Sequence, residues 1–320
     1  LSQCVHQLWL VDVLQPQLLN TCEQVVLVST SVLCAAVRLV QSSSLLDQLV
    51  HFLLRTHPLT HLLLQRCDHI SDQISMASLS LVEELLQKPH RDILEVLVLS
   101  YLRGRAYLSP SAAGVDDRHT ESNEDSDFLC LVPVQVRSAQ LLQEGGYESY
   151  VHDAHTLVRV TDCQSLSQSW DWPPSLPPSS SSGEGEEFSE GHLFKVLFDR
   201  LGRILEQPYE LNLQLTAVLS RLSAFNHPLL HEYLLNPYIH LSHCSRSLFS
   251  VLIRVMGDLM QRIQQISSLT DRLLNTRRRL LEYLTLLRGV IVLEEFCKEL
   301  AAIVFVKLQT SSSPESLMMS

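Results

Sequence analysis

Apolar residues recur at helical spacing along most of this chain. Leu248 and Leu252 begin a series that repeats every three or four residues, which places its members on one face of an α-helix. The segment before it has the same spacing, with Leu211 and Leu215 on one face until Pro228 interrupts the pattern. The pattern therefore predicts an α-helical protein.

Residues 1–108 are predicted to form a succession of helices separated by short polar breaks. Thr21 and Gln24 form a T-x-x-Q capping box, which we expect to begin a helix that runs through Val40. Pro58 is expected at the first turn of a later helix. Short breaks favour antiparallel neighbours, and no fixed repeat length is visible, so we expect an irregular α-solenoid or helical bundle.

The composition changes between residues 109 and 191. SAAGVDDRHTESNEDSD is acidic, and WDWPPSLPPSSSSGEGEEFSEG is rich in Pro, Ser, Gly and Glu. Neither stretch can bury enough apolar surface to offset the entropy of ordering, so both are predicted to be mobile. Between them, FLCLVPVQV is predicted to be a short extended piece and YESYVHDAHTLVRV to start a helix.

Helical patterning resumes at His192, and the last predicted helix runs from about Thr270 towards Val306. The expected organisation is a helical region at 1–108, a largely disordered linker with short ordered pieces at 109–191, a C-terminal helical region at 192–308 and a disordered tail at 309–320.

The composition supports a globular helical protein. Hydrophobic residues make up 46 % of the 320 residues. The chain has 10 glycines, so its glycine content is about half of the usual share of roughly 7 %. The net charge of -11 opposes nucleic-acid binding, which needs clustered Lys and Arg. The eight cysteines are evenly spread without a C-x-x-C pair, so we expect reduced, buried thiols in a cytoplasmic protein.

No membrane-spanning segment or secretory signal is expected. The longest uncharged apolar stretch, Val25 to Val37, is shorter than the roughly 20 residues that cross a bilayer. The C-terminal apolar run GVIVLEEFCKELAAIVFV contains Glu294, Glu295 and Lys298, whose charges are costly at membrane depth.

No catalytic constellation is recognisable. The nucleophile elbow G-x-S-x-G and the phosphate-binding glycine motifs are missing. Asp153 and His155 lie near a Ser-rich segment, but any chain of this length offers some Ser, His and Asp for a triad. We therefore expect no catalytic residue and no cofactor.

A zinc site, as in a zinc-dependent hydrolase, is the alternative, because histidine and cysteine cluster twice and zinc takes three or four such ligands. Ordinary surface or capping histidines are the simpler interpretation, so no metal is expected. The first cluster is His227, His231, His240, His243 and Cys244, and the weaker one is His57, His61, Cys67 and His69.

Arginines are the candidate partner-binding residues in this acidic chain. A dense basic patch is formed by Arg277, Arg278 and Arg279, with Arg272 and Arg288. It suits an acidic partner or anionic lipid, whereas a solvated helix face paired with Glu282 is the alternative. The arginines of the predicted helix near Leu248 are expected on its polar side. The candidates are Arg246, Arg254, Arg262, Arg277, Arg278 and Arg279.

Six blocks of the sequence resemble the FTS and Hook-interacting protein (FHIP) family, in the order of that family. The chain looks like a partial or shortened member. The blocks are Phe52 to His90, Tyr150 to His155, Gln207 to Leu222, His227 to Leu241, Arg246 to Gln264 and Gly289 to Ile303.

The resemblance implies a non-catalytic adaptor. Similar proteins join Hook coiled-coil proteins and FTS, an inactive ubiquitin-conjugating-like protein, into a complex that links early endosomal cargo, through a Rab GTPase, to dynein. It therefore implies a cytoplasmic protein that reaches endosomal membranes only through its partners. A generic helical protein-interaction module is the alternative that the helical pattern alone supports.

Overall fold

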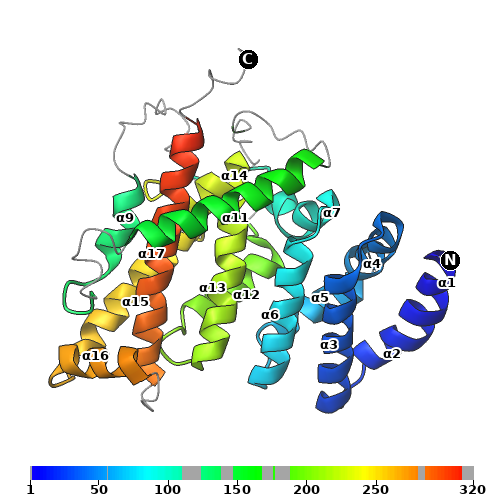
Figure 1. The fold of residues 1–320 in the computed structure, drawn as a ribbon, viewed down its shortest axis with the longest axis horizontal. Helices are drawn as coiled ribbons and strands as arrows, with labels where there is room; N and C mark the ends of the chain where they lie inside the picture. The colour runs from blue at the N-terminus through cyan, green and yellow to red at the C-terminus, as the bar shows by residue number, and fades with distance from the viewer. Residues whose placement is uncertain are drawn as a thin grey trace. The chain divides into compact units, whose positions relative to one another are not determined.

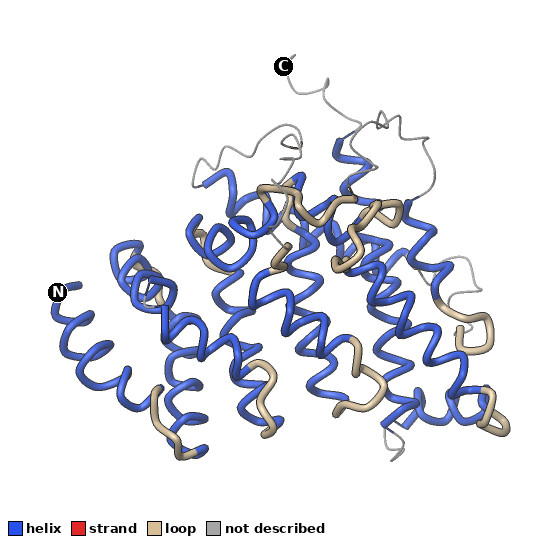
Figure 2. The backbone as a smooth tube through the Cα atoms, turned by 180° about the vertical axis from the view of Figure 1, so that it is seen from behind, coloured by secondary structure: helices blue, strands red, loops and turns tan. Residues whose placement is uncertain are grey.

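The computed structural model describes residues 2–55, 57–109, 124–137, 147–167, 176, 188–279 and 285–311 (Figure 1). Helices make up most of these residues, and the described part contains no β-strand (Figure 2). An isolated antiparallel bridge joins Leu108 and Leu241. The predicted all-α class is therefore confirmed. The chain divides into two compact units, which are described separately.

Unit 1 comprises residues 1–102, 164–170 and 189–200. Its helical elements, in which η denotes a π-helical segment, are α1 (Ser2–Cys4), η1 (Val5–Leu14), α2 (Gln15–Leu18), α3 (Glu23–Leu39), α4 (Ser43–Arg55), α5 (His57–Arg66), α6 (Asp72–Leu86), α7 (Arg91–Leu94), η2 (Glu95–Leu99), α8 (Ser100–Leu102) and most of α12 (Gly191–Leu201). Helices close in sequence pack together, as α4 does with α5, and α3 lies along α6 (Figure 1).

The T-x-x-Q capping box predicted for Thr21 and Gln24 is wrong. The N-cap of α3 is Cys22, and no side chain caps this helix. The helix starts after Thr21, so the Thr21 hydroxyl is not at the N-cap position that a capping box requires. Instead, Asn20 Oδ1 accepts a hydrogen bond from the Cys22 N–H (2.8 Å) and forms a turn before the helix.

A buried arginine holds the connection between α5 and α6. Arg200 of α12 is only 4 % exposed. Its guanidinium donates to the carbonyl oxygens of Cys67 (3.2 Å) and His69 (3.0 Å), and lies 2.8 Å from Asp68 Oδ1. It also donates to Ser75 Oγ (2.7 Å). These partners offset the cost of burying a charge, and they tie α12 to this turn.

Unit 2 comprises residues 103–163, 171–188 and 201–320. Its elements are α9 (Glu124–Leu131), most of α11 (Glu148–Ser167), α13 (Tyr209–Ala224), α14 (Pro228–Leu230), η4 (His231–Leu235), α15 (Leu248–Ile263), α16 (Leu269–Arg279) and α17 (Thr285–Ser311). The long helix α17 packs against α9, α13 and α16 (Figure 1).

The structure corrects the prediction of an extended piece in FLCLVPVQV. Residues 128–131 of this piece belong to α9, where the buried Phe128 ring packs edge-on against Phe249 (5.2 Å between centroids). Packing of that ring selects a helix over the strand that the local residue types favoured. The predicted helix start in YESYVHDAHTLVRV is confirmed by α11. Most of the predicted mobile linker lies outside the described residues, and the four predicted regions stay a prediction.

The single C-terminal helix predicted from Thr270 towards Val306 is also wrong. The structure has two helices here, α16 and α17. The side chains of Arg277 and Glu294 form an ion pair. A straight helix would separate residues this far apart by about 25 Å, so these residues do not belong to one straight helix.

The cysteines are free, but only some of them are buried. Cys34, Cys67 and Cys297 lie in the cores of the two units. Burial raises the pKa of Cys67 and of Cys297 to about 12. The prediction of buried thiols is wrong for the others, which are exposed: Cys4, Cys22, Cys130, Cys163 and Cys244.

We expect Gly289→Ala to destabilise the protein. A Cβ at this position of α17 would lie 2.5 Å from the Ile204 carbonyl oxygen and 2.9 Å from Leu205 Cα, and backbone atoms cannot move aside easily. Overpacking of this kind costs roughly 1–3 kcal/mol. Gly257→Ala is the matched control because a Cβ there meets no atom within 4 Å, so the better helix former should stabilise α15 by roughly 0.5–1 kcal/mol. Equal shifts of both melting temperatures would contradict the close packing at Gly289.

Candidate functional site

The predicted partner-binding arginines lie on and around α15 and α16 in unit 2. A capping box begins α15, because Ser247 Oγ accepts from the Ser250 N–H (3.3 Å) and Ser250 Oγ accepts from the Ser247 N–H (2.9 Å). The apolar series from Leu248 onward is buried, whereas Arg254 points to solvent. The amphipathic pattern of this helix is therefore confirmed.

Two of the candidate arginines near α15 are already engaged within the chain. Arg262 Nη2 pairs with Glu206 Oε1 (2.5 Å) and with Asp258 Oδ2 (2.8 Å), and these hydrogen bonds raise the pKa of Arg262. Arg246 is half-buried before the helix and also interacts within the chain. Among the candidates whose side chains are described, Arg254 is the one classed as exposed.

The side chain of Arg277, a member of the predicted basic patch, is engaged inside unit 2. Its guanidinium pairs with Glu294 and donates to the Val136 carbonyl oxygen (2.9 Å), and the side chain is 22 % exposed. Arg277 therefore serves the interior of unit 2 rather than a free surface. The side chains of Arg278 and Arg279, and the proposed pairing with Glu282, lie outside the described residues.

The pair of Arg277 and Glu294 belongs to a larger buried ion network on α17. Glu294 is 1 % and Lys298 is 2 % exposed, and Lys298 Nζ lies 3.2 Å from Glu294 Oε1. Lys298 also donates to Glu295 Oε1 (2.9 Å), whose other oxygen accepts from the Tyr150 hydroxyl. Burial and the Glu295 hydrogen bond raise the pKa of Tyr150. The network thus ties α17 to α11 and α16.

A second buried carboxylate fixes the chain between residues 103 and 109. Glu232 of η4 accepts hydrogen bonds from the Arg105 guanidinium (3.0 Å from Nε) and from the Tyr107 hydroxyl (2.5 Å). Next to it, the Ser109 N–H donates to the His240 carbonyl (2.9 Å). Glu232 therefore anchors a segment that is far away in the sequence.

Lys307 caps the C-terminal end of α13 from inside unit 2. Its Nζ donates to the carbonyl oxygens of Ser223 (3.1 Å) and Phe225 (2.8 Å). These carbonyls end the helix and carry its partial negative charge. Burial nevertheless lowers the pKa of Lys307 to about 7, with Asp162 as the opposing charge nearby.

The histidines of both proposed zinc clusters have separate surroundings. His227 is the N-cap of α14, where Nδ1 accepts from the Leu229 N–H (3.2 Å), and burial lowers its pKa to about 4. His69 Nδ1 accepts from the Ser71 N–H (3.0 Å). Among the described residues, no three His, Cys, Asp or Glu side chains come together in a group that could hold a metal ion.

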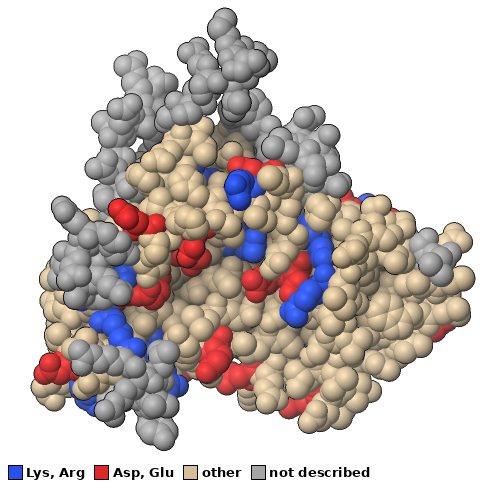
Figure 3. Space-filling model, viewed as in Figure 1, with Lys and Arg blue, Asp and Glu red and all other residues tan. Residues whose placement is uncertain are grey.

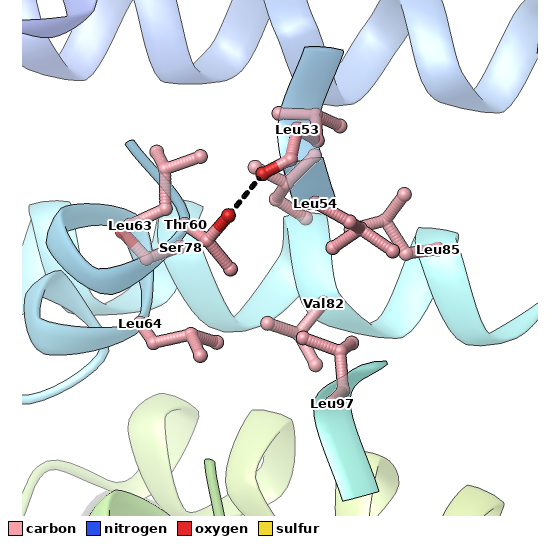
Figure 4. A pocket seen from close by; sticks show the side chains of 10 residues that line it. Leu53, Leu54, Thr60, Leu63, Leu64, Ser78, Val82, Leu85 and Leu97 are labelled. Atoms are coloured by element: carbon pink, nitrogen blue, oxygen red, sulfur yellow. Dashed lines mark hydrogen bonds between the residues drawn. The ribbon is translucent and has the colours of Figure 1, made fainter. Parts of the chain in front are cut away.

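Unit 1 contains a small apolar cavity between α4, α5 and α6 (Figure 4). Its volume is ≈ 20 Å³, which is far below the roughly 300 Å³ of a small-molecule site. Thr60 Oγ1 donates across it to the Leu53 carbonyl (2.5 Å), and the buried Ser78 hydroxyl has no partner. The cavity is therefore a packing gap rather than a cofactor site. Within the described residues, no helix is both long and apolar enough to cross a membrane.

Sequence reasoning missed the ion network on α17. Glu294, Glu295 and Lys298 served only as an argument against a membrane span. The available signal was the spacing of three and four residues between these opposite charges within a largely apolar helix, because charges on a buried face need partners.

Three family models match this chain. Residues 1–102 match the retinoic acid induced 16-like proteins, residues 190–283 match a family of unknown function (DUF5917), and residues 281–312 match the KELAA motif. Within this last match, residues 298–302 spell K-E-L-A-A, from the buried Lys298 to Ala301 and Ala302, which are fully buried. The KELAA match therefore coincides with the ion network.

We expect Glu294→Leu to lower the free energy of unfolding by about 3 kcal/mol or more, since removing one member of a buried ion pair strands its partners. Glu294→Leu combined with Lys298→Met should cost less than the sum of the two single changes. Chemical denaturation measures all three. Lys195→Ala breaks an exposed pair of the same spacing, with Asp199, and should change little. Additive losses in the double variant would contradict coupling between Glu294 and Lys298.

Lys307 should make stability depend on alkaline pH. Its pKa falls from 10.5 to about 7 on folding, so between these values the unfolded state binds a proton that the folded state has lost. Stability contributed at this position therefore rises with pH, by up to about 1.4 kcal/mol per pH unit. The difference in unfolding free energy between wild type and Lys307→Met should follow this rise between pH 7 and 10. A flat difference, like that expected for the exposed Lys195→Met, would refute the lowered pKa of Lys307.

Proposed function

We propose that this chain is a non-catalytic adaptor of a complex formed by FTS, Hook and FHIP-type proteins, which links early endosomal cargo to dynein. The observation that carries the proposal is the match of residues 1–102 to the retinoic acid induced 16-like proteins, a family related to the FTS and Hook-interacting proteins. In this role the protein is cytoplasmic, contacts a Rab GTPase, and reaches early endosomes through its partners.

The architecture supports a binding role. Both units are built from helices whose outer faces are available to other proteins, and the largest polar networks serve the interior of the fold. Glu294, Lys298 and Glu232 form buried ion pairs, so their burial is explained by a role in stabilising the fold and not by catalysis. Helical surfaces of this kind bind partner helices through a few well-packed anchor residues.

Arg254 is the proposed partner contact with the clearest structural support. It is exposed on α15, whose opposite face is buried in unit 2. Arginine is suited to this role because its planar guanidinium can pair with a carboxylate through two hydrogen bonds.

Affinity capture from cytosol with the whole chain as bait tests the proposal. We expect Hook coiled-coil proteins and FTS to be captured in stoichiometric amounts. Arg254→Glu should weaken capture of one of these partners about tenfold, as loss of an interface anchor does. Arg159→Glu makes the same charge change at an exposed position of α11 and serves as the matched control.

The outcomes separate the adaptor assignment from the contact site. If neither Hook nor FTS is captured by the wild-type chain, the adaptor assignment fails, and capture of unrelated proteins would favour a generic interaction module. If Arg254→Glu and Arg159→Glu both capture the partners as wild type does, only the contact at Arg254 is rejected.

A further inference from the structure

The outward face of α15 in unit 2 is centred on a glycine. Gly257 is exposed, and Ile253 and Gln261 lie one turn before and one turn after it on the same face. A Cβ at Gly257 would meet no atom within 4 Å in the part of the chain that the structure describes. Alanine would fit here and is the better helix former, so packing within this chain does not explain the glycine.

The side chains around Gly257 are of two kinds. On one flank, Ile253 is 51 % exposed and Met260 is half-buried. On the other flank, Arg254 and Gln261 are exposed. All four lie three or four positions from Gly257, which places them beside it on the helix surface. A face with one apolar and one polar flank is complementary to a helix that is itself amphipathic.

The segment that contains α15 and α16 is basic within an acidic chain. Residues 246–279 include seven Arg and two Asp, without Lys or Glu, whereas the whole chain has a net charge of -11. Figure 3 shows Lys and Arg side chains over the part of unit 2 that contains these two helices, with Asp and Glu beside them. Arg262 already pairs with Asp258 and Glu206. Arg254 forms no ion pair with a residue that the structure describes, so a carboxylate of another protein is complementary to it.

We propose that the face of α15 around Gly257 is the docking site for an acidic, amphipathic α-helix of a partner protein. The two helices cross at Gly257, where the missing side chain lets the partner's backbone approach closely. Apolar side chains of the partner contact Ile253 and Met260, and one of its carboxylates pairs with Arg254. This inference rests on the proposed function, because it names the kind of partner element that meets Arg254.

Photo-cross-linking identifies what covers this face. p-Benzoylphenylalanine in place of the exposed Gln261, in the whole chain illuminated in cytosol, should cross-link to an acidic helical segment, which mass spectrometry of the linked peptides maps. The same amino acid in place of Thr156, which is exposed on α11, measures non-specific labelling. Rising salt concentration should lower the specific yield, because exposed charge pairs are screened.

Substitution of Gly257 separates binding from folding. Gly257→Ala should raise the melting temperature slightly and yet lower the cross-link yield several-fold, because its methyl group holds the partner helix away. Gly257→Leu should lower the yield at least about tenfold, as loss of an interface centre does. Thr156→Leu adds the same side chain to the exposed face of α11 and is the matched control, which should cross-link as the wild-type sequence does.

The outcomes distinguish the docking site from the adaptor assignment. A cross-link to an acidic helix of a protein other than Hook or FTS supports the docking site and counts against the adaptor assignment. Capture of Hook or FTS with a cross-link yield that Gly257→Leu leaves unchanged overturns the docking site alone. The docking site is also overturned by a cross-link to a second copy of the chain, to a segment that is not acidic, or to no protein, including the case in which the chain binds only vesicles that contain phosphatidylserine.

Discussion

The pairing of buried charges on α17 is the constraint on which unit 2 depends. Glu294 and Lys298 lie on the buried side of a helix whose core contacts are mostly apolar, and an unpaired charge there would cost several kcal/mol. Each charge therefore has to meet its partner. Arg277 brings α16 to Glu294, and Tyr150 brings α11 to Glu295. Both α16 and α11 are thus held against α17 by its carboxylates.

Polar side chains also fix the connections between helices elsewhere in the molecule. Arg200 holds the turn between α5 and α6 in unit 1, Glu232 holds the segment at Arg105, and Lys307 holds the end of α13 in unit 2. Arg200 and Lys307 donate to main-chain carbonyl oxygens, and Glu232 accepts from the Arg105 guanidinium and the Tyr107 hydroxyl. These contacts lie inside the two units, and the proposed adaptor role makes no use of them.

Apolar periodicity predicted most of the helices, because the buried faces of α13 and α15 repeat every three to four residues. It failed where a distant contact decides the local structure. Phe128 of α9 packs on Phe249, and Arg277 pairs with Glu294 across the break between α16 and α17, and the local pattern shows neither contact. Local spacing indicates that the charges of α17 need partners, but it could not identify Tyr150 as the partner of Glu295, since the two are far apart in the sequence. The apolar periodicity of α15 predicted that Arg254 is exposed. It could not predict the ion pair between Arg262 and Glu206.

The distribution of free thiols gives each unit its own chemical reporter. Cys34 and Cys67 are enclosed in unit 1, and Cys297 is enclosed in unit 2, while the other cysteines are already open to solvent. A thiol-alkylating reagent modifies the exposed thiols of the folded chain and reaches the enclosed ones only when their unit opens. Peptide mapping of the alkylated positions thus distinguishes the opening of one unit from that of the other in the same molecule.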